Sequence, residues 1–158
     1  QAVCGLHVDL KWPNDLQVDG KKLAGILAEA RPRATGLDVF VGIGINLRTA
    51  AELPPEVAAI ATSIEGAGYP APPREVLLAA LSTAFDRRAA QAEAEPAVLL
   101  AEWRSRLVTL GQRVRLATPS GEVEGEAVDV TSTGELVLAL PTGERRAFAA
   151  GDVTTVRR

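Results

Sequence analysis

A short segment near the start of the chain, Lys-Trp-Pro-Asn-Asp at residues 11–15, constrains the fold more than any other feature. Pro13 has no N–H to donate to a strand ladder, so a strand that precedes it must end there. Residues 6–11 alternate apolar and polar side chains, which predicts a half-buried strand leading into this corner. We expect Trp12 to pack as a rigid plate in the core and to fix where the polar side chains after it point.

A hairpin is predicted directly after the corner. Residues 16–18 and 23–30 are expected to form two strands, and Asp19-Gly20-Lys21 supplies a turn in which glycine adopts the positive φ of a tight hairpin. Residues 37–47 form a further strand, and we expect it to be central in the sheet because it is almost continuously apolar. The order of these strands predicts a mixed or antiparallel sheet.

Helical patterns follow the sheet. Pro54-Pro55-Glu56 predicts a short helix over residues 56–65, since proline is tolerated in the first helical turn. Apolar residues at helical spacing predict two longer helices over residues 74–93 and 96–107. Turn signals then separate five short strands, as in a small β-barrel of SH3-like size. These strands are expected at residues 113–117, 122–130, 135–140, 145–149 and 153–156.

The change of pattern predicts an α+β chain of two domains, residues 1–107 and 108–158. A formal net charge of −3 argues against general affinity for nucleic acid. The sequence contains no apolar run of roughly 18 residues, so no membrane span is expected. A single cysteine, Cys4, cannot form an internal disulfide or a zinc site, and a cytoplasmic location is expected. No catalytic triad can be built from Cys4 and the one histidine, His7.

Three segments, in this order, resemble the biotin protein ligase family: residues 11–15, Gly-Lys-Lys-Leu-Ala-Gly-Ile-Leu at 20–27, and Val-Phe-Val-Gly-Ile-Gly-Ile-Asn at 39–46. The resemblance covers the whole chain but begins partway into the family's catalytic domain. It implies a partial domain of the class II synthetase-like type followed by the family's SH3-like domain. We therefore expect a C-terminal fragment whose Gly/Arg-rich loop lies upstream, and which is inactive alone.

The resemblance implies an ATP-dependent ligase that uses Mg²⁺, forms biotinyl-AMP from biotin and ATP, and transfers biotin to a lysine of a carrier protein. The expected acceptor is the biotin carboxyl carrier protein of acetyl-CoA carboxylase. Such chemistry brings two anions together, so it requires a cation at their meeting point. In the family a lysine at the place of Lys22 contacts the carboxylate and the α-phosphate. We predict that Lys22 is catalytic and binds biotin; the alternative is an ordinary solvated hairpin lysine.

Asn14 and Asp15 follow Pro13, where the chain must turn. They are either Asx-turn residues that bond nearby backbone N–H groups or ligands of a metal–triphosphate site. The resemblance implies that Asp15 faces the reacting centre, so we predict a catalytic role for Asp15 and Mg²⁺ binding by both residues. Asn14 is also expected to contact ATP. Lys11 is expected either to face the phosphates or to brace the turn through an ion pair.

A biotin pocket requires flat aliphatic surface and close backbone approach, which suits Gly25, Ile26 and Leu27. Gly25 alternatively marks a bulge or a close strand crossing. Gly42 is expected to add to this pocket. In the family the asparagine that ends the third segment lies against the adenylate, so we predict that Asn46 and Gly44 bind ATP or adenylate.

Residues 48–63 are expected to form the adenylate-side loop and helix. A lipoate ligase-like enzyme and a non-catalytic module that binds the carrier protein are the alternative functions. The resemblance implies that the C-terminal domain supports nucleotide and carrier-protein binding. The sequence leaves open whether the chain forms a homodimer through the sheet, and DNA binding is expected only where an upstream domain provides it.

Overall fold

The computed structural model describes residues 3–49, 54–119 and 121–156. The chain divides into two compact units, the first made of Gln1–Val8 and Asn14–Leu77 and the second of Asp9–Pro13 and Leu78–Arg158. The boundary expected between residues 107 and 108 stays a prediction. None of the helices in the described ranges is long and apolar enough to cross a membrane.

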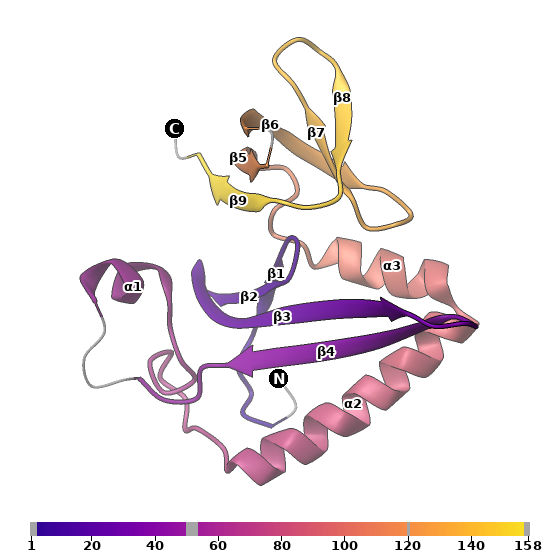
Figure 1. The fold of residues 1–158 in the computed structure, drawn as a ribbon. Helices are drawn as coiled ribbons and strands as arrows, with labels where there is room; N and C mark the ends of the chain where they lie inside the picture. Colours follow the sequence, from indigo (N-terminus) through magenta and orange to yellow (C-terminus); the bar gives the residue numbers. More distant parts are fainter. Residues whose placement is uncertain (1–2, 50–53, 120, 157–158) are drawn as a thin grey trace. The chain divides into compact units, whose positions relative to one another are not determined.

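The first unit is built on an antiparallel sheet in which β2, β3 and β4 are neighbours in chain order (Figure 1). These strands comprise Asp15–Val18, Lys21–Pro32 and Leu37–Ile45. The predicted hairpin between β2 and β3 is confirmed, with Val18 opposite Lys21. Asp19 and Gly20 form its turn with φ of 50° and 76°, a conformation that glycine adopts without steric cost.

The prediction that the strand over residues 37–47 is central is wrong. Among the described residues β4 pairs only with β3, and it ends the strand order of its sheet. Its apolar side chains are largely exposed, at 61% for Val39 and 52% for Phe40. Continuous apolarity is typical of a strand covered on both faces, but the pattern contains no information on whether a neighbour pairs with the strand.

The ladder between β2 and β3 contains one bulge. Leu16 lies opposite Ala24, but the next residue of β2, Gln17, lies opposite Lys22, so Leu23 has no partner in this ladder. One extra residue reverses which face the following side chains occupy. Leu23 and Ala24 are accordingly both buried, at 4% and 3% exposure, where a regular strand would alternate. Leu23 packs with two other buried residues, Leu6 and Ile64.

Helix α1 (Pro55–Ile60) is shorter than the helix predicted over residues 56–65. The chain leaves the helix at Ala61, whose φ of −118° and ψ of 154° are extended. Thr62 N–H then donates to the carbonyl oxygen of Lys22 at 2.9 Å. A backbone bond to the start of β3 therefore replaces the last helical turns.

Helix α2 (Arg74–Ala94) matches the helix predicted over residues 74–93, but none of its residues is fully buried. Half-buried side chains recur at helical spacing, at Leu77, Ala80, Leu81 and Ala84. The neighbouring apolar residues Val76 and Phe85 are each 48% exposed.

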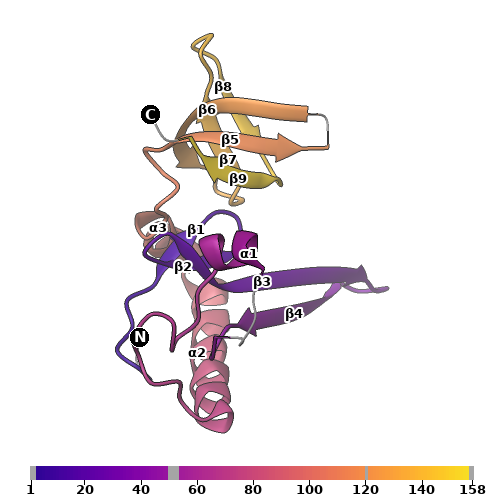
Figure 2. The same ribbon diagram turned by 90° about the vertical axis from the view of Figure 1, so that its left-hand side faces the viewer.

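The second unit contains β1, α3 and a five-stranded antiparallel sheet with strand order β8-β7-β6-β5-β9 (Figure 2). All five predicted strands are confirmed to within two residues. The strand pairing leaves β8 and β9 as the two ends, so the described residues form an open sheet and not a closed barrel. The elements are β1 (Asp9–Lys11), α3 (Pro96–Ser105), β5 (Arg113–Thr118), β6 (Gly121–Val130), β7 (Leu136–Ala139), β8 (Arg145–Phe148) and β9 (Asp152–Thr155). The strand predicted over residues 6–11 is thus reduced to β1, and the helix over 96–107 ends two residues early.

Trp12 lies in the core of the second unit with only 1% of its surface exposed. Its backbone N–H donates to Thr109 Oγ1 at 3.0 Å, and its indole Nε1–H donates to the carbonyl oxygen of Gly134 at 2.9 Å. The peptide bond between Trp12 and Pro13 is cis. The expected structural role of Trp12 is confirmed, because both of its polar groups are satisfied inside the core.

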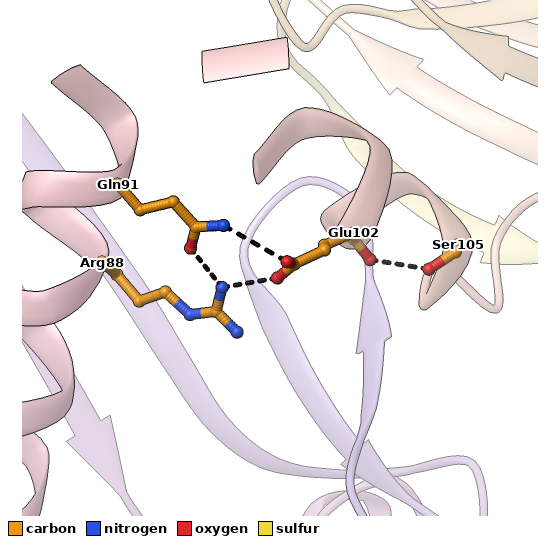
Figure 3. A network of polar contacts seen from close by, with 4 residues as sticks. All are labelled: Arg88, Gln91, Glu102 and Ser105. Carbon is orange, nitrogen blue, oxygen red and sulfur yellow. Dashed lines mark hydrogen bonds and ion pairs between the residues drawn. The ribbon is translucent and has the colours of Figure 1, made fainter. Parts of the chain in front are cut away.

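An exposed polar network joins helices α2 and α3 in this unit. Figure 3 shows Arg88 and Gln91 of α2 meeting Glu102 of α3, with Arg88 Nη1 2.5 Å from Glu102 Oε2. Ser105 Oγ donates to the carbonyl oxygen of Glu102 at 2.8 Å. Hydrogen bonds from Arg88 and then Gln91 lower the pKa of Glu102.

Candidate functional site

A groove with little side-chain cover lies on the face that β2, β3 and β4 share. Gly25 lies directly opposite Asp15 on β2 and Gly44 on β4, and Leu27 lies opposite Gly42. Side chains alternate along a strand, so these five residues belong to one face, and three of them are glycines. The groove measures about 480 Å³ and is open to solvent. It is lined by Asn14, Lys22, Gly25, Ile26, Leu27, Gly42, Ile43 and Gly44.

Lys22 provides the positive charge of the groove. Its Nζ lies 2.6 Å from Oδ1 of Asp15, while its side chain is 49% exposed and that of Asp15 17% exposed. Oδ1 is buried and has no hydrogen-bond partner among the described residues, so the contact is an ion pair that lacks hydrogen-bond alignment. The ammonium is therefore held by the carboxylate and still reaches solvent, where a second anion can approach it.

Asn14 is fixed at the edge of the groove by β3. Its side-chain Nδ2 donates to the backbone carbonyl oxygen of Ile26 at 2.7 Å. Its backbone carbonyl oxygen accepts the N–H of Ile26 at 3.0 Å. The amide N–H group is thus turned toward the backbone of β3. The side-chain oxygen Oδ1 is left as the group of Asn14 that can accept a hydrogen bond or bind a cation.

A second cavity of about 340 Å³ lies at the start of β3 and beside α1. Asn46, predicted to contact the adenylate, lines this cavity and not the groove. Its Nδ2 donates to the carbonyl oxygen of Thr62 at 3.0 Å, which leaves Oδ1 as an acceptor. The cavity is lined by Lys21, Asn46, Arg48, Thr49, Val57, Ala58, Ala61, Thr62, Ser63 and Gly66.

The structure thus brings seven predicted residues together in the groove, Asn14, Lys22, Gly25, Ile26, Leu27, Gly42 and Gly44, and adds Asp15 through its ion pair. Lys11 ends β1 and belongs to the second unit. Residues 50–53 of the expected adenylate-side loop lie outside the described residues. The roles of all these predicted site residues in binding and catalysis stay predictions.

Most of the lining of the second cavity falls within residues 46–63, where adenylate contacts were predicted, but sequence reasoning missed Lys21 and Gly66. Ser63 Oγ accepts the N–H of Gly66 at 2.9 Å and lies 3.0 Å from Thr49 Oγ1, so the two hydroxyls are joined. Lys21 Nζ donates to the carbonyl oxygen of Ala58 at 3.2 Å. The available sequence signal for this cavity was Lys21, which directly precedes Lys22 but lines the second cavity and not the groove.

The residues near Lys22 can contribute few oxygens to a metal ion. No group of three or more His, Cys, Asp or Glu side chains that suits a metal occurs in the part of the chain that the structure describes. Oδ2 of Asp15 and Oδ1 of Asn14 are the two oxygens not engaged in the contacts above. This donor set fits Mg²⁺, which takes one or two protein oxygens when phosphates and water complete its shell.

Comparison with known families agrees with this geometry. Residues 2–46 match the model of the biotin/lipoate A/B protein ligase family, and residues 109–154 match that of the biotin protein ligase C-terminal domain. A biotin–[acetyl-CoA-carboxylase] ligase of Mycobacterium tuberculosis is 39% identical over 158 residues, which is 99% of this chain and 56% of the relative. The chain belongs to the biotin protein ligase family.

Another family member, the bifunctional ligase/repressor BirA of Bacillus subtilis, is 30% identical over 95% of this chain and 47% of its own length. The chain thus spans about half the length of these curated relatives.

The fold is also that of the family. The apo biotin protein ligase of Aquifex aeolicus superposes with a TM-score of 0.77 at 26% identity, over 96% of this chain and 66% of that one. The Aquifex aeolicus ligase in complex with biotin and ATP gives a TM-score of 0.74 at 27% identity, over 97% and 63%. These matches confirm the α+β class predicted from the sequence, with antiparallel sheets and few helices.

Proposed function

We propose that the protein containing this chain is an ATP-dependent biotin protein ligase and that the groove holds biotin. The observation that carries the proposal is the Lys22 ammonium, 2.6 Å from Asp15 and at the end of a groove floored by glycines. The bicyclic ring system of biotin is compact and largely apolar, so it fits a pocket wall made of backbone and Leu27. The carboxylate at the end of biotin's side chain would then meet the ammonium group of Lys22. The volume of the groove, about 480 Å³, lies in the range of small-molecule sites.

In the first step a carboxylate oxygen of biotin attacks the α-phosphorus of ATP. A new O–P bond forms, the bond from the α-phosphorus to the bridging oxygen breaks, and pyrophosphate leaves. Lys22 would stabilise the negative charge that two converging anions create, and Asp15 would hold the lysine in place. Bound Mg²⁺ would neutralise phosphate charge, and Asp15 and Asn14 are the residues that would hold it.

In the second step the amine of a carrier-protein lysine attacks the acyl carbon of biotinyl-AMP. An amide bond forms, AMP leaves and the amine loses a proton to solvent or to a nearby base. The ligase contributes mainly by positioning the two reactants and by shielding the adenylate from water. Asn46, with Oδ1 left as an acceptor, is the residue of the second cavity that we propose contacts the nucleotide.

The proposed acceptor is the biotin carboxyl carrier protein of acetyl-CoA carboxylase, because the Mycobacterium tuberculosis relative is named for that carboxylase. The SH3-like character of the second unit would serve carrier and nucleotide binding. A cytoplasmic location, a homodimer and a DNA-binding domain upstream are further proposals. The Bacillus subtilis relative is named as both ligase and repressor, which supports testing the last of them.

The test uses the full-length gene product with biotin, Mg·ATP and a biotin carrier domain, and mass spectrometry detects biotin on the carrier lysine. Lys22→Ala should lower the transfer rate by at least about 100-fold, because it removes the cation from the meeting point of the two anions. Arg33→Ala is a suitable control. It removes an exposed ion pair between the β3–β4 connection and Asp38 of β4, outside the groove, so transfer should be unchanged.

A lipoate ligase-like enzyme is the second candidate, since the family model that matches residues 2–46 covers biotin and lipoate ligases together. Thermal unfolding separates the two. Protection by biotin but not by lipoate supports the biotin ligase, and the reverse result supports the second candidate. A folded full-length protein that binds the carrier domain but transfers neither acid would be a non-catalytic module.

A further inference from the structure

Gly25 lies directly beneath the Lys22–Asp15 ion pair. A β-carbon added to Gly25 would lie 3.3 Å from both Cε and Nζ of Lys22 and 3.5 Å from Oδ1 of Asp15. The same addition at Gly42 or Gly44 meets a backbone oxygen, at 3.9 Å and 4.0 Å respectively. Of the three groove glycines, only Gly25 has the Lys22 ammonium in the space that a β-carbon would occupy.

The β-bulge explains how the ammonium arrives there. Lys22 and Gly25 are three positions apart, so in a regular strand their side-chain directions would be opposite. The unpaired Leu23 shifts the register, and Lys22 becomes the partner of Gln17. Gln17 lies two residues from Asp15 and so occupies the same face. Lys22 is therefore re-aimed onto the face of Asp15 and Gly25, a recognised effect of bulges next to active sites.

We propose that Gly25 is a positioning residue for Lys22: its missing side chain seats the ammonium against Asp15 at the end of the groove. This inference rests on the proposed function, in which Lys22 meets the two reacting anions. It differs from the expected role of Gly25 as a wall for biotin, because the glycine acts here through the lysine and not through the ligand.

The expected effect of Gly25→Ala follows from which group can move. A contact of 3.3 Å requires a neighbour to shift by a few tenths of an ångström, and the neighbour is the flexible end of a lysine that is 49% exposed. The backbone at Gly25 does not have the positive φ that disfavours alanine. The variant should therefore fold normally while the ammonium lies off its original position.

The first experiment compares wild type, Gly25→Ala and Gly42→Ala in the full-length gene product, with biotin, Mg·ATP and a biotin carrier domain. Gly25→Ala should lower kcat by at least about tenfold with Tm unchanged, since small misplacements of a reacting group are costly. Gly42→Ala adds a methyl group to the same groove away from the lysine, so it should chiefly raise the KM for biotin. An unchanged kcat in Gly25→Ala would overturn the proposal.

The second experiment measures biotin affinity in the Lys22→Ala variant. Calorimetry is used because it measures binding without requiring turnover. If Gly25 acts through Lys22, adding Gly25→Ala to this background should cost no further affinity. An equal loss with and without Lys22 would mean that the glycine is only a wall for the ligand.

A crystal structure of Gly25→Ala separates this proposal from the proposed function. The Lys22 Nζ to Asp15 Oδ1 distance should lengthen from 2.6 Å, whatever reaction the protein catalyses. An unchanged distance refutes the seating role even if biotin transfer is observed. A wild type that transfers no biotin refutes the function, whatever the distance.

Discussion

The two units differ in where their apolar side chains lie. In the second unit Trp12, Val114, Leu116, Leu136 and Leu138 are at most 1% exposed and belong to one core. In the first unit the buried cluster consists of Leu6, Leu23 and Ile64, while apolar residues such as Leu27, Leu37 and Val39 are more than 60% exposed. Core packing is therefore concentrated in the second unit and the candidate chemistry in the first. Their responses to mutation should therefore differ in kind.

The largest expected effect is on the stability of the second unit, from Trp12→Ala. Removing a fully buried indole leaves a cavity and should lower the free energy of unfolding by about 3–5 kcal/mol. Chemical denaturation followed by circular dichroism measures this loss. Leu27→Ala in the first unit is the control, because a residue 63% exposed should change stability by less than about 0.5 kcal/mol. Equal losses in the two variants would end the contrast between the units.

A smaller effect is expected from Thr109→Val, which keeps the shape of the side chain but removes its oxygen. The buried N–H of Trp12 then loses the acceptor that lies 3.0 Å away, at a cost of about 1–3 kcal/mol. Thr109→Ser restores the hydroxyl and should recover most of the loss. If valine is as stable as threonine at this position, packing alone holds Trp12.

The smallest expected effect is a pH dependence in the second unit. The Arg104 side chain, and then the backbone N–H of Val130, lower the pKa of Asp129 from its ordinary 3.8. A lowered folded-state pKa means that this stabilisation is complete above the ordinary value and is lost as the pH falls through the folded one. Asp129→Asn should therefore show a shallower loss of stability below about pH 4. Urea unfolding at several pH values measures the slope, and identical slopes would exclude the contribution.

The fold was predictable where local signals sufficed. Asp19-Gly20 identified the hairpin, and the turn signals identified all five strands of the second unit. The edge position of β4 was not predictable, because apolar content does not show which strands pair. The early end of α1 has a similar cause, since it depends on a hydrogen bond from Thr62 to Lys22, a residue distant in sequence.

The candidate site was predictable as a set of residue types but not as an arrangement. Glycines and a lysine in the resembling segments indicated the groove, and they do gather there. Gly25 was a sequence signal for a bulge, but the unpaired residue is Leu23, and the face on which Lys22 lies depends on the register against β2. The separation of Asn46 into a second cavity is likewise a product of the loop and helix that follow it.

Asp9–Pro13 belongs by packing to the second unit although it precedes most of the first along the chain. Residues 108–158 therefore do not contain all the residues that form the core of the second unit. A recombination event, or an engineered chimaera, that joined residues 108–158 of one relative to the front of another would pair a foreign tryptophan with Thr109 and Gly134. The Lys-Trp-Pro corner and its two distant partners should consequently be inherited together, and successful exchanges between relatives should carry both pieces.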